Sequence, residues 1–249
     1  PPAQAAVAAL GVGGPILLGV LSGHLPIGMA ASVGGLALSG SGSDSGDRLP
    51  GYAGSLLRSI ITGSAAVWVG IAIAGHGARS ALAVTAIGAL AGLVGGASRA
   101  MAASATQFVL FAIIASRLAE QGASAAGSAL CFGAGASWTA AWALLLRPRP
   151  PTRPPLQQPS LPAKLRRWRA SLATLAGWQY ALRLTLCLGL AEAVALLWPH
   201  HHAYWIALTV ALVVQRRRPA GLARTFQRTA GTAAGVLLGS LLLLGSLPS

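Results

Sequence analysis

Residues 124–146 read SAAGSALCFGAGASWTAAWALLL, a run of 23 residues without one charged side chain. A helix of about 20 apolar residues crosses the hydrocarbon core of a bilayer, and lengths of about 17 to 25 are tolerated. Backbone N–H and C=O groups in that core need internal partners, which a helix provides. The run is therefore predicted to be a transmembrane helix.

Similar runs lie on both sides of it, and together they predict an all-α, polytopic helical membrane protein. The chain of 249 residues is 54% hydrophobic and only 9% charged, whereas soluble domains carry about 25% charged residues. We expect about nine transmembrane helices, with the approximate ranges 5–22, 27–40, 55–75, 80–97, 102–118, 124–146, 179–198, 203–215 and 228–247.

The basic residues indicate how these helices are oriented. If residues 147–178 are cytoplasmic, all 18 Lys and Arg residues except Arg79 and Arg117 lie in or beside cytoplasmic loops. Such an excess of basic residues is typical of the cytoplasmic side, so the N-terminus is also expected there. The cytoplasmic loops then account for the net charge of +14. We expect no nucleic-acid partner, because a nucleic-acid surface would interleave basic and aromatic residues on a soluble face.

Residues 147–178 are predicted to be a basic, Pro-rich cytoplasmic linker. Several prolines in its first half favour extended chain, and Ala163–Leu175 has the pattern of an amphipathic helix. Two interpretations remain open for its basic side chains: binding to anionic lipid headgroups, or a solvated connector with cytoplasmic charge. These side chains are Lys164, Arg166, Arg167 and Arg169.

The linker divides the chain into two predicted membrane domains. Residues 1–146 form a first bundle of about six helices, and residues 179–249 form the start of a second, similar repeat of about three. Internal repeats of this kind are common in transporters. The chain has no initiator Met and stops just after an apolar run, which suggests a piece of a longer protein with a truncated second repeat.

Glu192 is the only acidic residue well inside an apolar run. A charged carboxylate costs several kcal/mol there unless it is paired or faces water. Proton coupling or substrate contact is one hypothesis, and a structural ion pair or hydrogen bond is the other. Arg183 lies nine residues earlier and therefore on the opposite face of the same helix.

Other candidate residues lie near the ends of the predicted helices. Arg58, Arg183 and Arg228 could bind an organic carboxylate bidentately, or extend toward lipid phosphates. Tyr204 and Trp205 are candidates for substrate contact or for an interfacial aromatic belt. Small residues spaced by four favour close helix packing, at Gly88, Gly92 and Gly96 and again at Gly231, Gly235 and Gly239.

No motif indicates catalysis or a cofactor. The sequence lacks the usual nucleophile, phosphate-loop and zinc-protease patterns, so we expect no enzyme. His200–His202 has no Cys, Asp or Glu close by in the sequence, so neither a metal nor another cofactor is predicted.

The second half resembles the FUSC family of fusaric-acid-resistance and aromatic-acid-exporter-like membrane proteins. The resemblance rests on Tyr204–Thr209, Gln215, Arg228, Gly231-Thr232 and Gly235. It implies efflux of aromatic or other organic acids across the bacterial inner membrane, sometimes with a periplasmic adaptor of the membrane-fusion type. The short linker implies a compact member, although Arg216–Arg218 is more basic than the family pattern.

Three functions stay open at this point. An exporter of small organic anions would need a protonatable group such as Glu192. A passive organic-anion channel would not need Glu192 and would select through its arginines. A non-transporting envelope scaffold is suggested only by the basic linker. The lipid bilayer is the expected partner, and the sequence leaves an oligomer open.

Overall fold

The computed structural model describes residues 2–39, 49–119, 122–146, 161–198 and 204–214. The described residues form α-helices joined by short turns, without a strand among them. The helices are α1 (Pro2–Leu21), α2 (Leu25–Ser39), α3 (Leu49–Ile73), α4 (Ala78–Val94), α5 (Arg99–Leu118), α6 (Ala125–Leu145), α7 (Leu161–Leu172), α8 (Leu175–Leu197) and α9 (Tyr204–Val213).

The all-helical membrane fold predicted from the sequence is confirmed. Eight of the nine apolar runs coincide with helices, and the amphipathic part of the linker forms α7. Five described helices, α1, α3, α5, α6 and α8, are long and apolar enough to cross a membrane, whereas α2 and α4 are apolar but shorter. The ninth predicted run, 228–247, lies outside the described residues.

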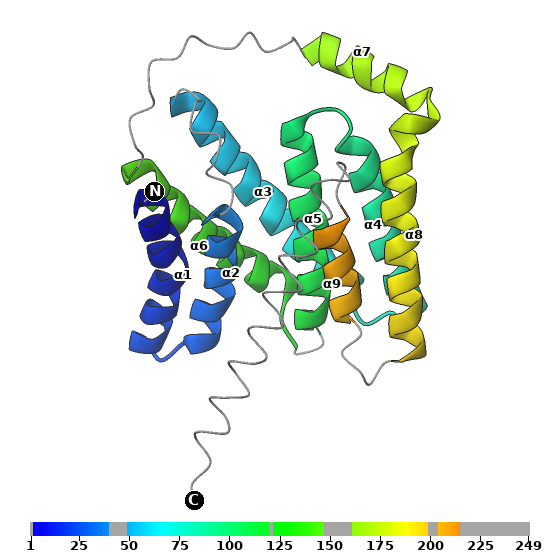
Figure 1. Ribbon diagram of the computed structural model, residues 1–249. Coiled ribbons are helices and arrows are strands. Elements are labelled where there is room, and N and C mark those ends of the chain that lie inside the picture. The colour runs from blue at the N-terminus through cyan, green and yellow to red at the C-terminus, as the bar shows by residue number, and fades with distance from the viewer. Residues whose placement is uncertain (1, 40–48, 120–121, 147–160, 199–203, 215–249) are drawn as a thin grey trace, which may run out of the picture.

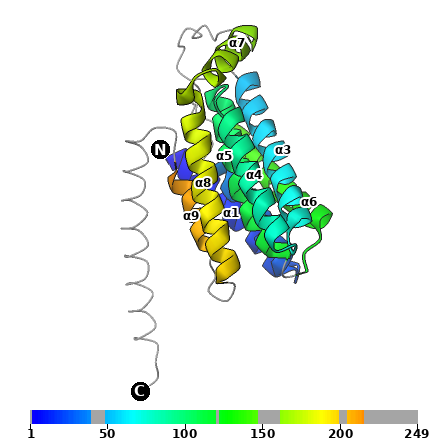
Figure 2. The same cartoon turned by 90° about the vertical axis from the view of Figure 1, so that its right-hand side faces the viewer.

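The helices other than α7 form a bundle in which successive helices run in alternating directions (Figure 1). α7 lies across one end of this bundle in both views (Figures 1 and 2). We call it the α7 end; α4 ends there and α5 begins there. Arg58, Arg99 and Arg183 lie on the halves of their helices nearer to this end, whereas Arg79 and Arg117 lie toward the opposite end.

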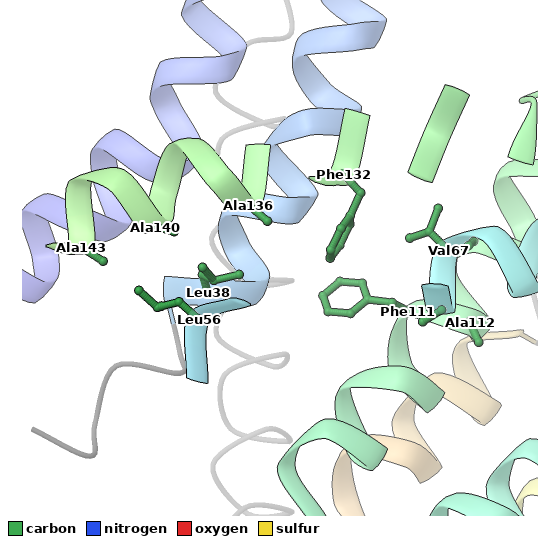
Figure 3. Close-up of a cluster of buried hydrophobic side chains, with 11 residues drawn as sticks. Leu38, Leu56, Val67, Phe111, Ala112, Phe132, Ala136, Ala140 and Ala143 are labelled. Carbon is green, nitrogen blue, oxygen red and sulfur yellow. The ribbon is translucent and has the colours of Figure 1, made fainter. Parts of the chain in front are cut away.

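A first buried cluster joins α2, α3, α5 and α6. At its centre the rings of Phe111 and Phe132 meet edge to face, with centroids 4.9 Å apart (Figure 3). Such aromatic pairs are favourable beyond the area that they bury. Ala136, Ala140 and Ala143 continue the cluster along α6, so this core depends on small side chains as much as on large ones.

Glycine allows α2 and α6 to approach at backbone distance. A Cβ atom on Gly34 would lie 2.9 Å from the backbone nitrogen of Ala136, and one on Gly135 would lie 2.9 Å from the Cα of Ala31. Lipid tails provide no hydrophobic drive between helices, so association relies on such close packing and on hydrogen bonds. Thr139 of α6 supplies such a hydrogen bond to α1. Its fully buried hydroxyl donates to the carbonyl oxygen of Gly11, and also to that of Gly135 in its own helix.

A second buried cluster joins α4 and α5 to α8 and α9 across the linker. Its members are Val84, Val109, Ile113, Leu184, Leu188, Ala191, Ala207, Leu208 and Ala211. α5 contributes to both clusters, Phe111 to the first and Ile113 to the second. α5 therefore links the two clusters, and α4 likewise packs both on α5 and on α8 after the linker.

The outer surface of the bundle is apolar. Leu82, Leu130, Leu186 and Leu190 are each about 70% exposed. Side chains of this kind, repeated along several helices, would make an apolar patch far larger than soluble monomers present. They are suited to contact with lipid, which agrees with the membrane fold.

Candidate functional site

Glu192 lies on the buried face of α8, where only 6% of the residue is exposed. Its face also carries Ala181, Leu184, Leu188 and Ala191, spaced by three or four residues as one side of a helix requires. Leu188, one turn earlier, is fully buried. Among the described residues, Glu192 is the only acidic side chain. The carboxyl group of Glu192, which is costly to bury, thus belongs to the residue that follows Ala191 of the second cluster.

Small residues on α4 allow α8 to approach closely along the face that carries Glu192. A Cβ atom on Gly92 would lie 2.7 Å from the Cα of Ala181, and one on Gly88 would collide with the side chain of Leu188. Gly96 follows the end of α4 and lies instead beside the indole of Trp168. The predicted glycine face of α4 therefore meets α8 through two of its three members.

Two hydroxyl groups lie on helices that contribute to the second cluster, Thr85 on α4 and Ser116 on α5. Thr85 of α4 lies within contact distance of α8 at Gly189, three residues before Glu192, and its Oγ1 donates to the carbonyl oxygen of Ala81. Ser116 of α5 is buried and donates to the carbonyl oxygen of Ile113, a member of the second cluster. Sequence reasoning did not single out either hydroxyl, because Ser and Thr are frequent in the apolar runs.

Of the three predicted arginines, the structure describes Arg58 and Arg183. Arg183 is half-buried, with its Nε atom buried, and lies nine residues before Glu192, or about 13 Å along the axis of α8. Arg58 is exposed on α3, which packs against α5 and α6. Arg228 lies outside the described residues. Glu192 and Arg183 therefore lie at different depths of the bundle.

The aromatic pair begins α9. Trp205 is about half exposed at the end of the bundle opposite to α7. α9 packs on α8 and α5, and the Tyr180 hydroxyl of α8 donates to the carbonyl oxygen of Val214 just after α9 ends. This packing brings the helix that starts with Tyr204 and Trp205 against the helix that carries Glu192.

Metal ligands do not cluster in the part of the chain that the structure describes. No group of three or more His, Cys, Asp or Glu side chains there could hold an ion. His200–His202 and the glycines Gly231, Gly235 and Gly239 fall outside the described residues.

Comparison with known families gives one match. Residues 188–248 match the family described as "Fusaric acid resistance protein-like". The match starts at Leu188, includes Glu192 and α9, and confirms the family resemblance seen from Tyr204 onward. Comparisons with curated proteins and with solved structures gave no match.

Proposed function

We propose that this membrane protein is a transporter of the inner membrane that exports aromatic or other organic acids. The match of residues 188–248 to the fusaric acid resistance family supports a resistance-type transport function. The buried carboxyl group of Glu192, inside this segment, is the observation that carries the proposal. Ionisable residues within membrane segments are costly and are typically part of ion or substrate pathways.

Glu192 would serve as the coupling group. The protonated form suits a buried position on the face of α8 that carries Leu188 and Ala191, and the charged form needs more polar stabilisation, from water, hydrogen bonds or a cation. A carboxyl group that alternates between these states can let a proton enter the cell as an organic anion leaves. Export would then be driven by the proton gradient.

Arg183 would help to collect the anion from the cytoplasm. It lies two turns into α8 on the side of the α7 end, where the excess of basic residues predicts the cytoplasmic face. A guanidinium group can bind a carboxylate through two parallel hydrogen bonds. Arg58, being exposed on α3, is better suited to contact lipid phosphate. Arg228, and the aromatic rings of Tyr204 and Trp205, remain candidates for the same pathway.

The assembly would extend beyond one membrane bundle. The proposed organisation keeps residues 1–146 as the first bundle, 147–178 as a cytoplasmic linker and 179–249 as the start of a second repeat. A periplasmic adaptor of the membrane-fusion type would carry the acid onward, and oligomerisation would complete the pathway in the membrane.

Uptake into inside-out membrane vesicles tests this function. Vesicles with the full-length protein and an acidic interior should accumulate labelled benzoate against its gradient, and vesicles without the protein should not. Passive equilibration that ignores the pH gradient would instead identify an organic-anion channel. No difference between the two kinds of vesicle would reject transport of aromatic acids.

A further inference from the structure

We propose that the α7 end of the bundle holds an anionic phospholipid, with its headgroup on the arginines of α7 and an acyl chain in an adjacent crevice. The crevice has a volume of about 350 Å³ and lies between α3, α4 and α5. Its walls include Val69, Ile87, Leu90, Val94, Met101 and Phe108. The inference is independent of the transported substrate.

The crevice has the chemistry of an acyl-chain site. Among the residues that the structure describes, no charged side chain lines it, and its polar lining is limited to the hydroxyls of Thr62 and Ser104. An organic acid would lose its hydration there without gaining a charged partner. Leu90 is 62% exposed and Met101 is 40% exposed, so the crevice opens on the surface that faces lipid.

The position and length of the crevice along the bundle match the hydrocarbon part of one bilayer leaflet. Val94 and Met101 lie at the α7 end, where α4 stops and α5 starts, and Ile87 lies two turns deeper in α4. Seven helical residues span about 10 Å, which fits within the roughly 15 Å of hydrocarbon that one leaflet contributes. A chain entering beside α7 can follow the crevice toward the bilayer centre.

α7 provides the complementary charge. Arg166, Arg167 and Arg169 are exposed on a helix that has no acidic residue. Arginine binds phosphate oxygens bidentately. Basic residues near a membrane surface are attracted to anionic lipid. A zwitterionic lipid would gain less from these three side chains.

A direct contact fixes α7 beside the crevice. The Trp168 indole Nε1 donates a hydrogen bond of 3.0 Å to the carbonyl oxygen of Leu93, one residue before Val94 of the crevice wall. Leu93 is in the last turn of α4, and its carbonyl oxygen also accepts a hydrogen bond of 3.0 Å from the backbone N–H of Gly96. The bond from Trp168 therefore ties α7 to the last turn of α4, one residue from the crevice wall, and we infer that the arginines of α7 can reach a headgroup at the mouth of the crevice.

Lipid retention by the purified full-length protein tests the proposal. The protein in maltoside detergent is mixed with equal amounts of palmitoyl-oleoyl phosphatidylglycerol and phosphatidylcholine, and the lipids that co-elute in gel filtration are counted by mass spectrometry. We expect at least a threefold preference for phosphatidylglycerol. Equal retention of the two lipids would overturn the proposal.

Two kinds of variant separate the headgroup from the chain. Joint Arg166→Gln, Arg167→Gln and Arg169→Gln changes should bring the preference close to parity. Ala105→Phe, which fills the crevice, should reduce retained phosphatidylglycerol at least threefold. Met101→Trp blocks the exposed mouth of the crevice without placing bulk in the core, and it should reduce retained phosphatidylglycerol by a similar factor. Arg79→Gln, an exposed charge at the opposite end, should change nothing. Unchanged retention in the arginine variant, or in a folded crevice variant, would refute the shared site.

Discussion

Gly92 of α4 and Ala181 of α8 meet backbone to backbone: a Cβ atom on Gly92 would lie 2.7 Å from the Cα of Ala181. Carbon atoms do not pack at that distance, so the two helices would have to separate if the glycine were replaced. This contact joins a helix that precedes the linker to one that follows it. It also holds α8, and with it Glu192, against the second cluster.

Gly92→Leu is expected to destabilise the protein severely. Overpacking typically costs about 1–3 kcal/mol, and a backbone contact leaves less room to relax than a side-chain contact. The readout is the yield of monodisperse protein and its thermal unfolding in detergent. Gly13→Leu is the matched control, because no atom of the described residues lies within 4 Å of a Cβ atom there. A Gly92→Leu protein as stable as the Gly13→Leu protein would show that α4 and α8 do not meet as described.

Thr139→Val should weaken the contact of α6 with α1. The Thr139 hydroxyl donates to the Gly11 carbonyl oxygen of α1 at 3.3 Å as well as to its own helix. Interhelical hydrogen bonds in membranes contribute about 0.6 kcal/mol on average and at most about 1.7. Reversible unfolding in mixed micelles should detect a loss in this range. Thr185→Val is the control, since the bond from Thr185 goes to Ala181 of the same helix, and it should cost less.

The predicted orientation places α7 in the cytoplasm. A cysteine introduced at Ala170, exposed on α7, should not react with a membrane-impermeant maleimide in intact cells. A cysteine at His76, exposed in the turn between α3 and α4 at the opposite end, should react. Cys131 and Cys187 are replaced first so that the new thiol alone reports. The reverse pattern of labelling would invert the topology.

Arg183→Gln should weaken capture of the organic anion without abolishing transport. Losing a charge-assisted hydrogen bond costs about 1.5–3 kcal/mol, so the apparent KM for benzoate should rise at least about tenfold while the maximal rate changes little. Arg58→Gln, at an exposed position of α3, is the paired variant and should leave the KM close to that of the parent. Equal effects of the two changes would argue against a specific role for Arg183.

Much of this fold could be predicted because hydrocarbon imposes simple rules on sequence. Uninterrupted apolar runs located eight helices, and a change of pattern in the linker located α7. The spacing of Gly88 and Gly92 indicated a packing face, and the structure places α8 on it. Glu192 could also be singled out from the sequence, because a carboxyl group inside an apolar run is costly and therefore unusual.

The arrangement of the helices could not be predicted in the same way. α5 packs in both clusters, but a helix that is apolar on most sides gives no sign of which face meets protein and which meets lipid. The crevice beside α7 depends on how α3, α4 and α5 diverge, which is a property of three helices together. The bond from Trp168 to Leu93 joins residues 75 positions apart, and neither residue is unusual in its own segment.

The role of Glu192 in coupling is tested with full-length protein in liposomes under an imposed pH gradient. Glu192→Gln keeps the size of the side chain and its capacity for hydrogen bonds but removes the exchangeable proton. The variant is expected to fold and to exchange labelled benzoate down a concentration gradient, but no longer to accumulate benzoate against one. Thr85→Val, a change on the facing helix that removes no charge, should retain accumulation. If the Glu192→Gln protein accumulates benzoate as well as the parent does, Glu192 is structural and the coupling mechanism is wrong.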